Sequence, residues 1–208
     1  MCGASIADLR GKMAPRRYLY AMILDPAACQ PIIELTRAWV EKAVIGLNLC
    51  PFAKAVQAKG QVRYAVSNAG DSEALAADLQ AELLALAAAD PAQIDTTLLI
   101  HPGVLQDFLD YNDFLDLADA CLEALELDGI IQIASFHPHY QFAGTGPDDI
   151  ENYTNRSPHP ILHLLREDSI ERAVAAFPDA SDIYERNMET LRRLGAAGWQ
   201  ELHLSPAN

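Results

Sequence analysis

Apolar residues recur along this chain with two alternating periods, one typical of helices and one typical of strands. After Pro31 they recur at helical spacing as far as Leu47, and Pro51 ends that helix. Further helices are predicted over residues 72–89, 104–126, 169–177 and 180–194. Strands are predicted over residues 62–67, 96–101, 130–136 and 161–166. Because strands and helices alternate through short connections, the pattern predicts right-handed crossovers and an α/β fold.

The predicted sheet has three or four strands, is largely parallel, and has helices packed on it. The strand over residues 130–136 is apolar on both faces, which indicates a central position. The direction of the strand over residues 161–166 does not follow from the pattern, so a ferredoxin-like α+β sandwich stays open as the alternative. We expect a loose N-terminal tail over residues 1–24 and a single globular α/β domain over residues 25–208.

The composition favours a folded and strongly acidic protein. Half of the 208 residues are hydrophobic, which excludes a disordered chain. The chain has 29 acidic and 15 basic residues, a formal net charge of −14, and it has no Lys or Arg between Arg63 and Arg156. Because such a surface repels phosphate backbones, we expect no nucleic-acid partner.

The cysteines and the apolar runs favour the cytoplasm. The four cysteines form no CxxC pair, and a chain with this much apolar material does not need disulfides, so we expect reduced thiols. No apolar run approaches the roughly 18 residues of a membrane span, and the N-terminus lacks the pattern of a secretory signal. We therefore expect a cytoplasmic protein without a membrane partner.

Two predicted strands end in the same way, with a histidine followed by a proline. His101 closes the strand over residues 96–101, and His137 follows the strand over residues 130–136. If these strands are parallel neighbours, both imidazoles lie at the edge where open α/β sheets bind ligands. An imidazole titrates near neutral pH, so either histidine is a candidate general acid or base. The alternative is that each imidazole caps its strand end by hydrogen bonding to loop backbone.

Cys50 precedes Pro51 at the end of the first helix. Because proline favours the first position of a helix, residues 51–58 could form a second, short helix with Cys50 as its N-cap and Lys54 one turn on. That placement would lower the pKa of the thiol and make it a nucleophile or a metal ligand. The alternatives are a buried structural cysteine and, on very weak evidence, a haem ligand.

The long segment over residues 137–160 is rich in Gly, Pro, Asn and Asp, and a loop of this length in a compact domain is usually functional. It contains Arg156, which with Asn155, Ser157 and loop amides could hold a carboxylate or a phosphate by paired hydrogen bonds. The alternative is that Arg156 pairs with an acid of the same loop, namely Asp148, Asp149 or Glu151.

Five blocks of the sequence together carry a family resemblance. They are WVEKAVIGLNLCPFAK (39–54), TTLLIHP with DFLDYNDFL (96–115), IQIASFHPHYQFAGT (131–145), NYTNRSPHPILHLLRE (152–167) and IERAV…FPD (170–179). In these blocks the chain resembles the bacterial and plastid family called domain of unknown function 1415, over roughly residues 31–199. The resemblance implies no assigned reaction. It implies motif positions at Cys50, Pro51, His101, His137, Gln141, Asn155, Arg156, Ser157 and His163.

The residues favour an enzyme that acts on a small anionic molecule at the C-terminal edge of the sheet. The expected catalytic residues are Cys50, His101 and His137, and the expected ligand-binding residues are Lys54, Arg63, Gln141, Asn155, Arg156, Ser157 and His163. No residue is assigned to a metal. Two alternatives stay open: a metal- or haem-binding protein with Cys50 and the histidines as ligands, and a non-catalytic binding or assembly module. The cofactor, the reaction type and the oligomeric state do not follow from the sequence.

Overall fold

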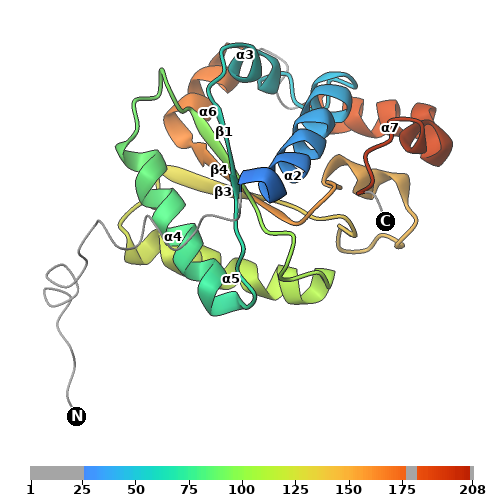
Figure 1. Cartoon of the computed structure of the whole chain (residues 1–208). Coiled ribbons are helices and arrows are strands. Elements are labelled where there is room, and N and C mark those ends of the chain that lie inside the picture. The colour runs from blue at the N-terminus through green and yellow to red at the C-terminus, as the bar shows by residue number, and fades with distance from the viewer. Residues whose placement is uncertain (1–25, 177–181, 207–208) are drawn as a thin grey trace, which may run out of the picture.

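The computed structural model describes residues 26–176 and 182–206, and the predicted tail over residues 1–24 lies outside the described residues (Figure 1). The fold is α/β, with helices packed on a four-stranded sheet, as the sequence predicts. Its strands are β1 (Val62–Val66), β2 (Thr96–Ile100), β3 (Ile131–Phe136) and β4 (Ile161–Arg166). Each lies within one residue of its predicted bounds.

The strands have the order β1-β2-β4-β3. The predicted central position of β3 is therefore wrong: β3 lies at an edge of the sheet, because β4 inserts between it and β2. β1 and β2 are parallel, and β4 is antiparallel to both of its neighbours, so three of the four strands run in the same direction. β1 and β2 form a simple βαβ unit because they are direct neighbours. β2 and β3 form a split βαβ unit with β4 between them, which is the element found in ferredoxin-like folds. The sheet therefore combines both arrangements considered from the sequence.

One face of the sheet is covered by α4 (Ser72–Ala88) and α5 (Phe108–Ala124), which lie in the lower part of Figure 1. The core on this face contains leucines that α4 buries completely, namely Leu75, Leu79 and Leu83. Helix α5 begins four residues later than predicted. Leu105 has a left-handed backbone (φ 55°), and the side chain of Asp107 caps the helix by accepting a hydrogen bond from the Leu109 N–H at 2.8 Å.

The other face is covered by α2 (Pro26–Trp39), the π-helical segment η2 (Val40–Ile45), the short helix α3 (Ala53–Ala58) and α6 (Glu167–Ala175). The core on this face gathers Trp39, Val40 and Ala43 from the helices with Leu98, Ile100 and Ile161 from the sheet. Figure 1 shows α3 and α6 at the same end of the molecule, in its upper part.

Helix α7 (Ile183–Gln200) packs against the 3-10 helix η3 (Ile150–Thr154) in the long loop between β3 and β4. The sequence predicts that this last helix stops at Gly195. The backbone angles of Gly195 (φ 65°, ψ 172°) are non-helical, so the helix is interrupted there as predicted, and a further helical segment follows the kink to Gln200. Glycine adopts this left-handed conformation without the steric cost that a Cβ atom adds.

Candidate functional site

Two hollows in the described part of the structure are lined by residues that the sequence singles out. The main cavity has a volume of about 550 Å³ and lies between the sheet and the segments η2, α3 and α6. The second, which we call the Arg156 hollow, has a volume of about 530 Å³ and lies between the long loop and the C-terminal end of α7. Both volumes fall in the range of small-molecule sites.

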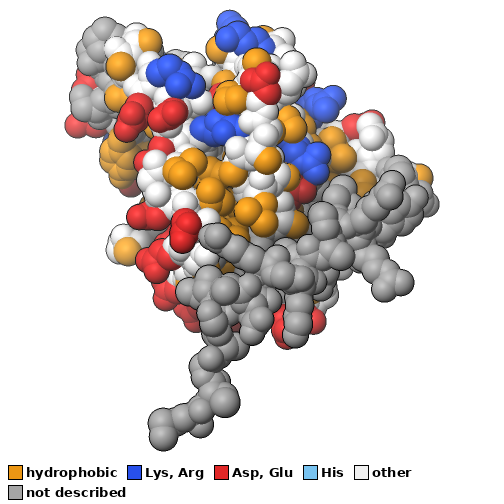
Figure 2. Space-filling view, turned by 90° about the vertical axis from the view of Figure 1, so that its left-hand side faces the viewer, with side chains coloured by type: hydrophobic (Ala, Val, Ile, Leu, Met, Phe, Trp, Pro, Cys, Tyr) orange, Lys and Arg blue, Asp and Glu red, His pale blue; other side chains and the backbone are white. Residues whose placement is uncertain are grey.

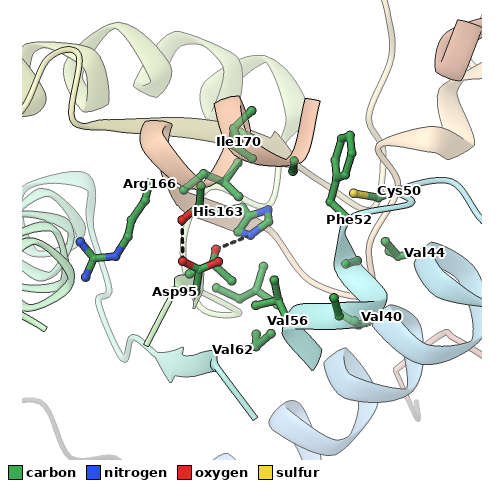
Figure 3. Close-up of a pocket in the computed structure, with 18 of the residues that line it drawn as sticks. Val40, Val44, Cys50, Phe52, Val56, Val62, Asp95, His163, Arg166 and Ile170 are labelled. Atoms are coloured by element: carbon green, nitrogen blue, oxygen red, sulfur yellow. Dashed lines mark hydrogen bonds between the residues drawn. The ribbon is translucent and has the colours of Figure 1, made fainter. Parts of the chain in front are cut away.

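The walls of the main cavity are mostly apolar (Figure 3). The sheet, η2, α3 and α6 contribute aliphatic and aromatic side chains: Val40, Val44, Phe52, Val56, Val62, Leu98, Phe136, Leu165 and Ile170. The residues that line it include one Lys or Arg, Arg166. Its guanidinium points away from the cavity in Figure 3 and donates hydrogen bonds to the backbone carbonyls of Leu86 (2.5 Å) and Ala89 (2.7 Å).

His163 projects from β4 into the main cavity (Figure 3). In the sheet it pairs with Leu98 of β2 on one side and with Ala134 of β3 on the other. Its Nε2 atom lies 2.7 Å from the hydroxyl oxygen of Thr96. Burial lowers the pKa of His163 from 6.5 to about 4, so the imidazole is neutral at pH 7.

Cys50 lines the same cavity. The backbone N–H groups of Phe52 and Ala53 lower the pKa of its thiol, as expected for a cysteine before a helix, but burial raises it by more. The pKa of Cys50 is therefore raised from its ordinary value, so the prediction that this thiol has a lowered pKa is wrong. The physical reason is that α3 positions Cys50 against apolar walls, where a thiolate loses more solvation than two amides return.

A second polar pair lines the main cavity. The hydroxyl of Ser169, on α6, donates a hydrogen bond of 2.6 Å to a carboxylate oxygen of Asp95. This bond joins α6 to the residue that precedes β2. The hydroxyl proton of Ser169 is therefore already used within the wall of the cavity.

Arg156 lines the second hollow. Its guanidinium donates hydrogen bonds to the carbonyls of Pro147 (2.5 Å) and Tyr140 (3.4 Å) and lies 4.2 Å from the ring centroid of Tyr153. Two acids of the same loop bond elsewhere: Glu151 pairs with Arg192, and Asp149 accepts a hydrogen bond from the Gly146 N–H. Among the described residues, Arg156 makes no ion pair.

Ser157 and His159 lie beside Arg156 in the same hollow. The Ser157 hydroxyl donates a hydrogen bond of 2.6 Å to the carbonyl of His159, which shapes the turn before β4. Burial lowers the pKa of His159, so this imidazole is neutral at pH 7. Arg156 is the one Lys or Arg among the described residues that line the hollow.

His101 and His137 are both fully buried, and neither lines either hollow. The Nδ1 atom of His101 lies 3.2 Å from the Val104 carbonyl, and the Nε2 atom of His137 lies 3.2 Å from the Leu105 carbonyl. Both rings pack against Tyr111, with centroids 5.8 Å and 5.1 Å away. The two strand ends therefore meet, as expected, although β4 lies between β2 and β3. The catalytic role of these histidines stays a prediction.

The remaining predicted ligand residues lie outside the main cavity, and most bond within the fold. Asn155 donates to the carbonyl of Ser135 at 3.1 Å, and Gln141 donates to the carbonyl of Thr145 at 2.5 Å. On the opposite face of the sheet, Arg63 forms a two-point ion pair with Glu82 of α4, at 2.7 and 2.9 Å. Lys54 is exposed on α3 and lines neither hollow.

A family model described as "Protein of unknown function (DUF1415)" matches residues 31–201. The chain belongs to this family. No curated protein and no solved structure gave a match. The matched part of the DUF1415 chain contains every residue predicted for a site, together with the whole lining of the main cavity.

Two further properties concern residues 26–176 and 182–206 of the DUF1415 chain. No helix there has both the length and the apolar character that a membrane span requires. The same residues contain no group of three or more His, Cys, Asp or Glu side chains arranged to hold a metal ion. Cys50 and His163 line the main cavity, His139 and His159 line the Arg156 hollow, and His101 and His137 lie at the buried strand ends.

Sequence reasoning missed the two polar groups that accompany His163 and Cys50 in the main cavity of the DUF1415 chain. These are Thr96 and the pair of Asp95 with Ser169. The only sequence signal for Thr96 was the pair of threonines, Thr96 and Thr97, with which this apolar strand begins. Its role depends on the pairing of β2 with β4, which joins residues 67 positions apart and leaves no local pattern.

Proposed function

We propose that this protein binds a small anionic molecule, a carboxylate or a phosphate, in the Arg156 hollow. The observation that carries the proposal is a guanidinium that is held in place but has no carboxylate partner among the described residues. The nearby acid Glu151 pairs with Arg192 instead, so Arg156 keeps its charge available.

The chemistry of arginine supports this role. A guanidinium has five N–H donors, of which the bonds to Tyr140 and Pro147 use two. The remaining donors lie in a planar fork that matches two oxygens of a carboxylate or phosphate. Because two carbonyls and the Tyr153 ring already orient the group, binding an anion would cost little further ordering of this side chain.

The proposal concerns binding alone. An acid–base or thiol reaction of the bound anion stays a prediction from the sequence. Cys50, His101 and His137 do not line the Arg156 hollow. The imidazoles that do line it are those of His139 and His159. Binding can therefore be tested separately from any reaction.

The test is a thermal-shift titration with inorganic phosphate and with a series of small mono- and dicarboxylates. A ligand that binds only the folded state raises Tm in a saturable way. We expect this increase for the native chain and its loss in Arg156→Ala. Arg192→Ala is the matched control, since it removes a nearby guanidinium that is paired with Glu151. Equal stabilisation of Arg156→Ala and the native chain would show that the anion does not bind at Arg156.

A further inference from the structure

The main cavity contains a histidine whose protonation can be assigned from its partners. The hydroxyl oxygen of Thr96 lies 2.6 Å from the Leu164 carbonyl and 2.7 Å from His163 Nε2. A carbonyl can only accept a hydrogen bond, and a threonine hydroxyl has one proton to give. Thr96 therefore donates to Leu164, and His163 Nε2 must carry a proton and donate to Thr96.

This assignment leaves the other ring nitrogen of His163 as a hydrogen-bond acceptor. The imidazole is neutral, so Nδ1 carries a lone pair. The buried side-chain atoms without a partner in the described residues are Thr36 Oγ1, Thr97 Oγ1 and His101 Nε2. His163 Nδ1 is not among them and has no hydrogen-bond partner there, so it is open to the cavity that His163 lines.

The other polar groups of the cavity do not offer a free cation or a free hydroxyl proton. Ser169 donates its proton to Asp95, and Thr96 donates its proton to Leu164. The guanidinium of Arg166 is bound to backbone carbonyls behind the wall. An anion in this cavity would lose its hydration, find no cation, and face the Asp95 carboxylate.

We propose that the main cavity is a second binding site, which takes an uncharged and mainly apolar molecule carrying one hydrogen-bond donor. The apolar body of the molecule fills the space between α3, α6 and the sheet, and its hydroxyl or N–H group donates to His163 Nδ1. This ligand is uncharged, whereas the ligand proposed for the Arg156 hollow is an anion.

The proposal is tested with three probes that share one ring system: 2-naphthol, 2-naphthoate and naphthalene. We expect the native chain to bind 2-naphthol about tenfold more tightly than naphthalene, since one hydrogen bond contributes about 1.4 kcal/mol. We expect 2-naphthoate to bind most weakly. The proposal would be overturned if 2-naphthoate bound as tightly as 2-naphthol or more tightly, or if 2-naphthol did not bind.

Variants locate the bound probe. His163→Leu keeps the wall apolar and removes the acceptor, so 2-naphthol should bind this variant only as well as naphthalene does. His203→Asn is the control, because His203 is exposed and lines neither hollow, and asparagine tolerates its positive φ of 54°. If His163→Leu and the native chain bind 2-naphthol equally, the probe does not use His163.

The tautomer is tested without any variant. The nitrogen-15 chemical shifts of the His163 ring should show a proton on Nε2 and none on Nδ1 at pH 7. Addition of 2-naphthol should move the Nδ1 resonance and leave that of Nε2 close to its starting value. A proton on Nδ1 in the free protein would overturn the assignment and the proposed ligand class together.

Discussion

His101 and His137 are neutral side chains that shape the loops after β2 and β3. His137 shows this most fully: its Nδ1 atom accepts a hydrogen bond from the His139 N–H at 3.0 Å, and its Nε2 atom lies within bonding distance of the Leu105 carbonyl. Burial is the main cause that lowers the pKa of each from 6.5 to about 4. At the scale of single residues, position in the fold therefore decides the charge of each imidazole.

These pKa values predict a loss of stability in mild acid. The unfolded chain takes up protons on His101 and His137 below pH 6.5, whereas the folded chain resists protonation down to about pH 4. The free energy of unfolding is therefore unaffected by these two histidines above pH 6.5, and it decreases as the pH falls from 6.5 toward 4. At pH 5 the His101 imidazole should lower the free energy of unfolding by about 2 kcal/mol.

Urea unfolding of the native chain and of His101→Gln at pH 7 and pH 5 measures this effect. Carboxylates titrate in both proteins, so the difference between their pH dependences isolates His101. We expect His101→Gln to lose less stability on acidification than the native chain does. Identical pH dependences would show that His101 is protonated as easily in the folded state as in the unfolded one.

The raised pKa of Cys50 predicts a slow thiol. Only the thiolate reacts, so iodoacetamide at pH 8 should modify Cys50 at least about tenfold more slowly than it modifies free cysteine. Mass spectrometry of the Cys50 peptide after timed quenching gives the rate, and the urea-unfolded chain supplies the reference. A rate above that of free cysteine would mean that the amides of Phe52 and Ala53 outweigh burial.

At the scale of elements, Tyr111 joins α5 to the end of the sheet. Its side chain is fully buried, and its hydroxyl donates to the Ile161 carbonyl at 2.8 Å and accepts from the Phe136 N–H at 3.1 Å. One hydroxyl therefore satisfies a donor on β3 and an acceptor on β4. The same ring packs between His101 and His137, so α5, the strands β3 and β4, and the loops after β2 and β3 depend on it.

Tyr111→Phe should destabilise the protein by about 1–3 kcal/mol, because it leaves a buried N–H and a buried carbonyl without this partner. The free energy of unfolding in urea measures the change. Tyr184→Phe is the matched control, since the Tyr184 side chain is 62% exposed and its hydroxyl can bond to water. A loss in Tyr111→Phe no larger than in this control would contradict the role of Tyr111 as a link between strands.

At the scale of the whole molecule, charge is unevenly distributed. The chain has a net charge of −14, yet residues 37–63 contain five basic residues and one acid, Glu41. This segment runs from the end of α2 through η2 and α3 to the start of β1. Figure 2 shows one face of the molecule, where basic side chains gather above a hydrophobic area and most acidic ones lie below or to the left.

The net charge predicts that salt stabilises the folded chain. At pH 8, raising the sodium chloride concentration from about 0.02 M to 0.3 M shortens the screening distance several-fold and weakens the repulsion among the acids. We expect Tm to rise by a few degrees, measured by circular dichroism. A fall in Tm would show that favourable ion pairs such as Arg63 with Glu82 outweigh the net repulsion.

The sequence by itself determined the elements, because their signals are local. Apolar spacing and proline positions placed all four strands within one residue, and the His-Pro pairs located the strand ends that meet at Tyr111. The family resemblance over residues 31–199 was likewise readable from contiguous blocks, and the match over residues 31–201 confirms it.

Only the tertiary structure decided which candidate residues share a site. The insertion of β4 between β2 and β3 places His163 beside Thr96. Arg63 lies on the opposite face of the sheet, where it pairs with Glu82. Burial reversed the expected pKa shift of Cys50. The physical reason is common to these cases: strand order, register and desolvation depend on contacts between residues far apart in the chain, which no local pattern records.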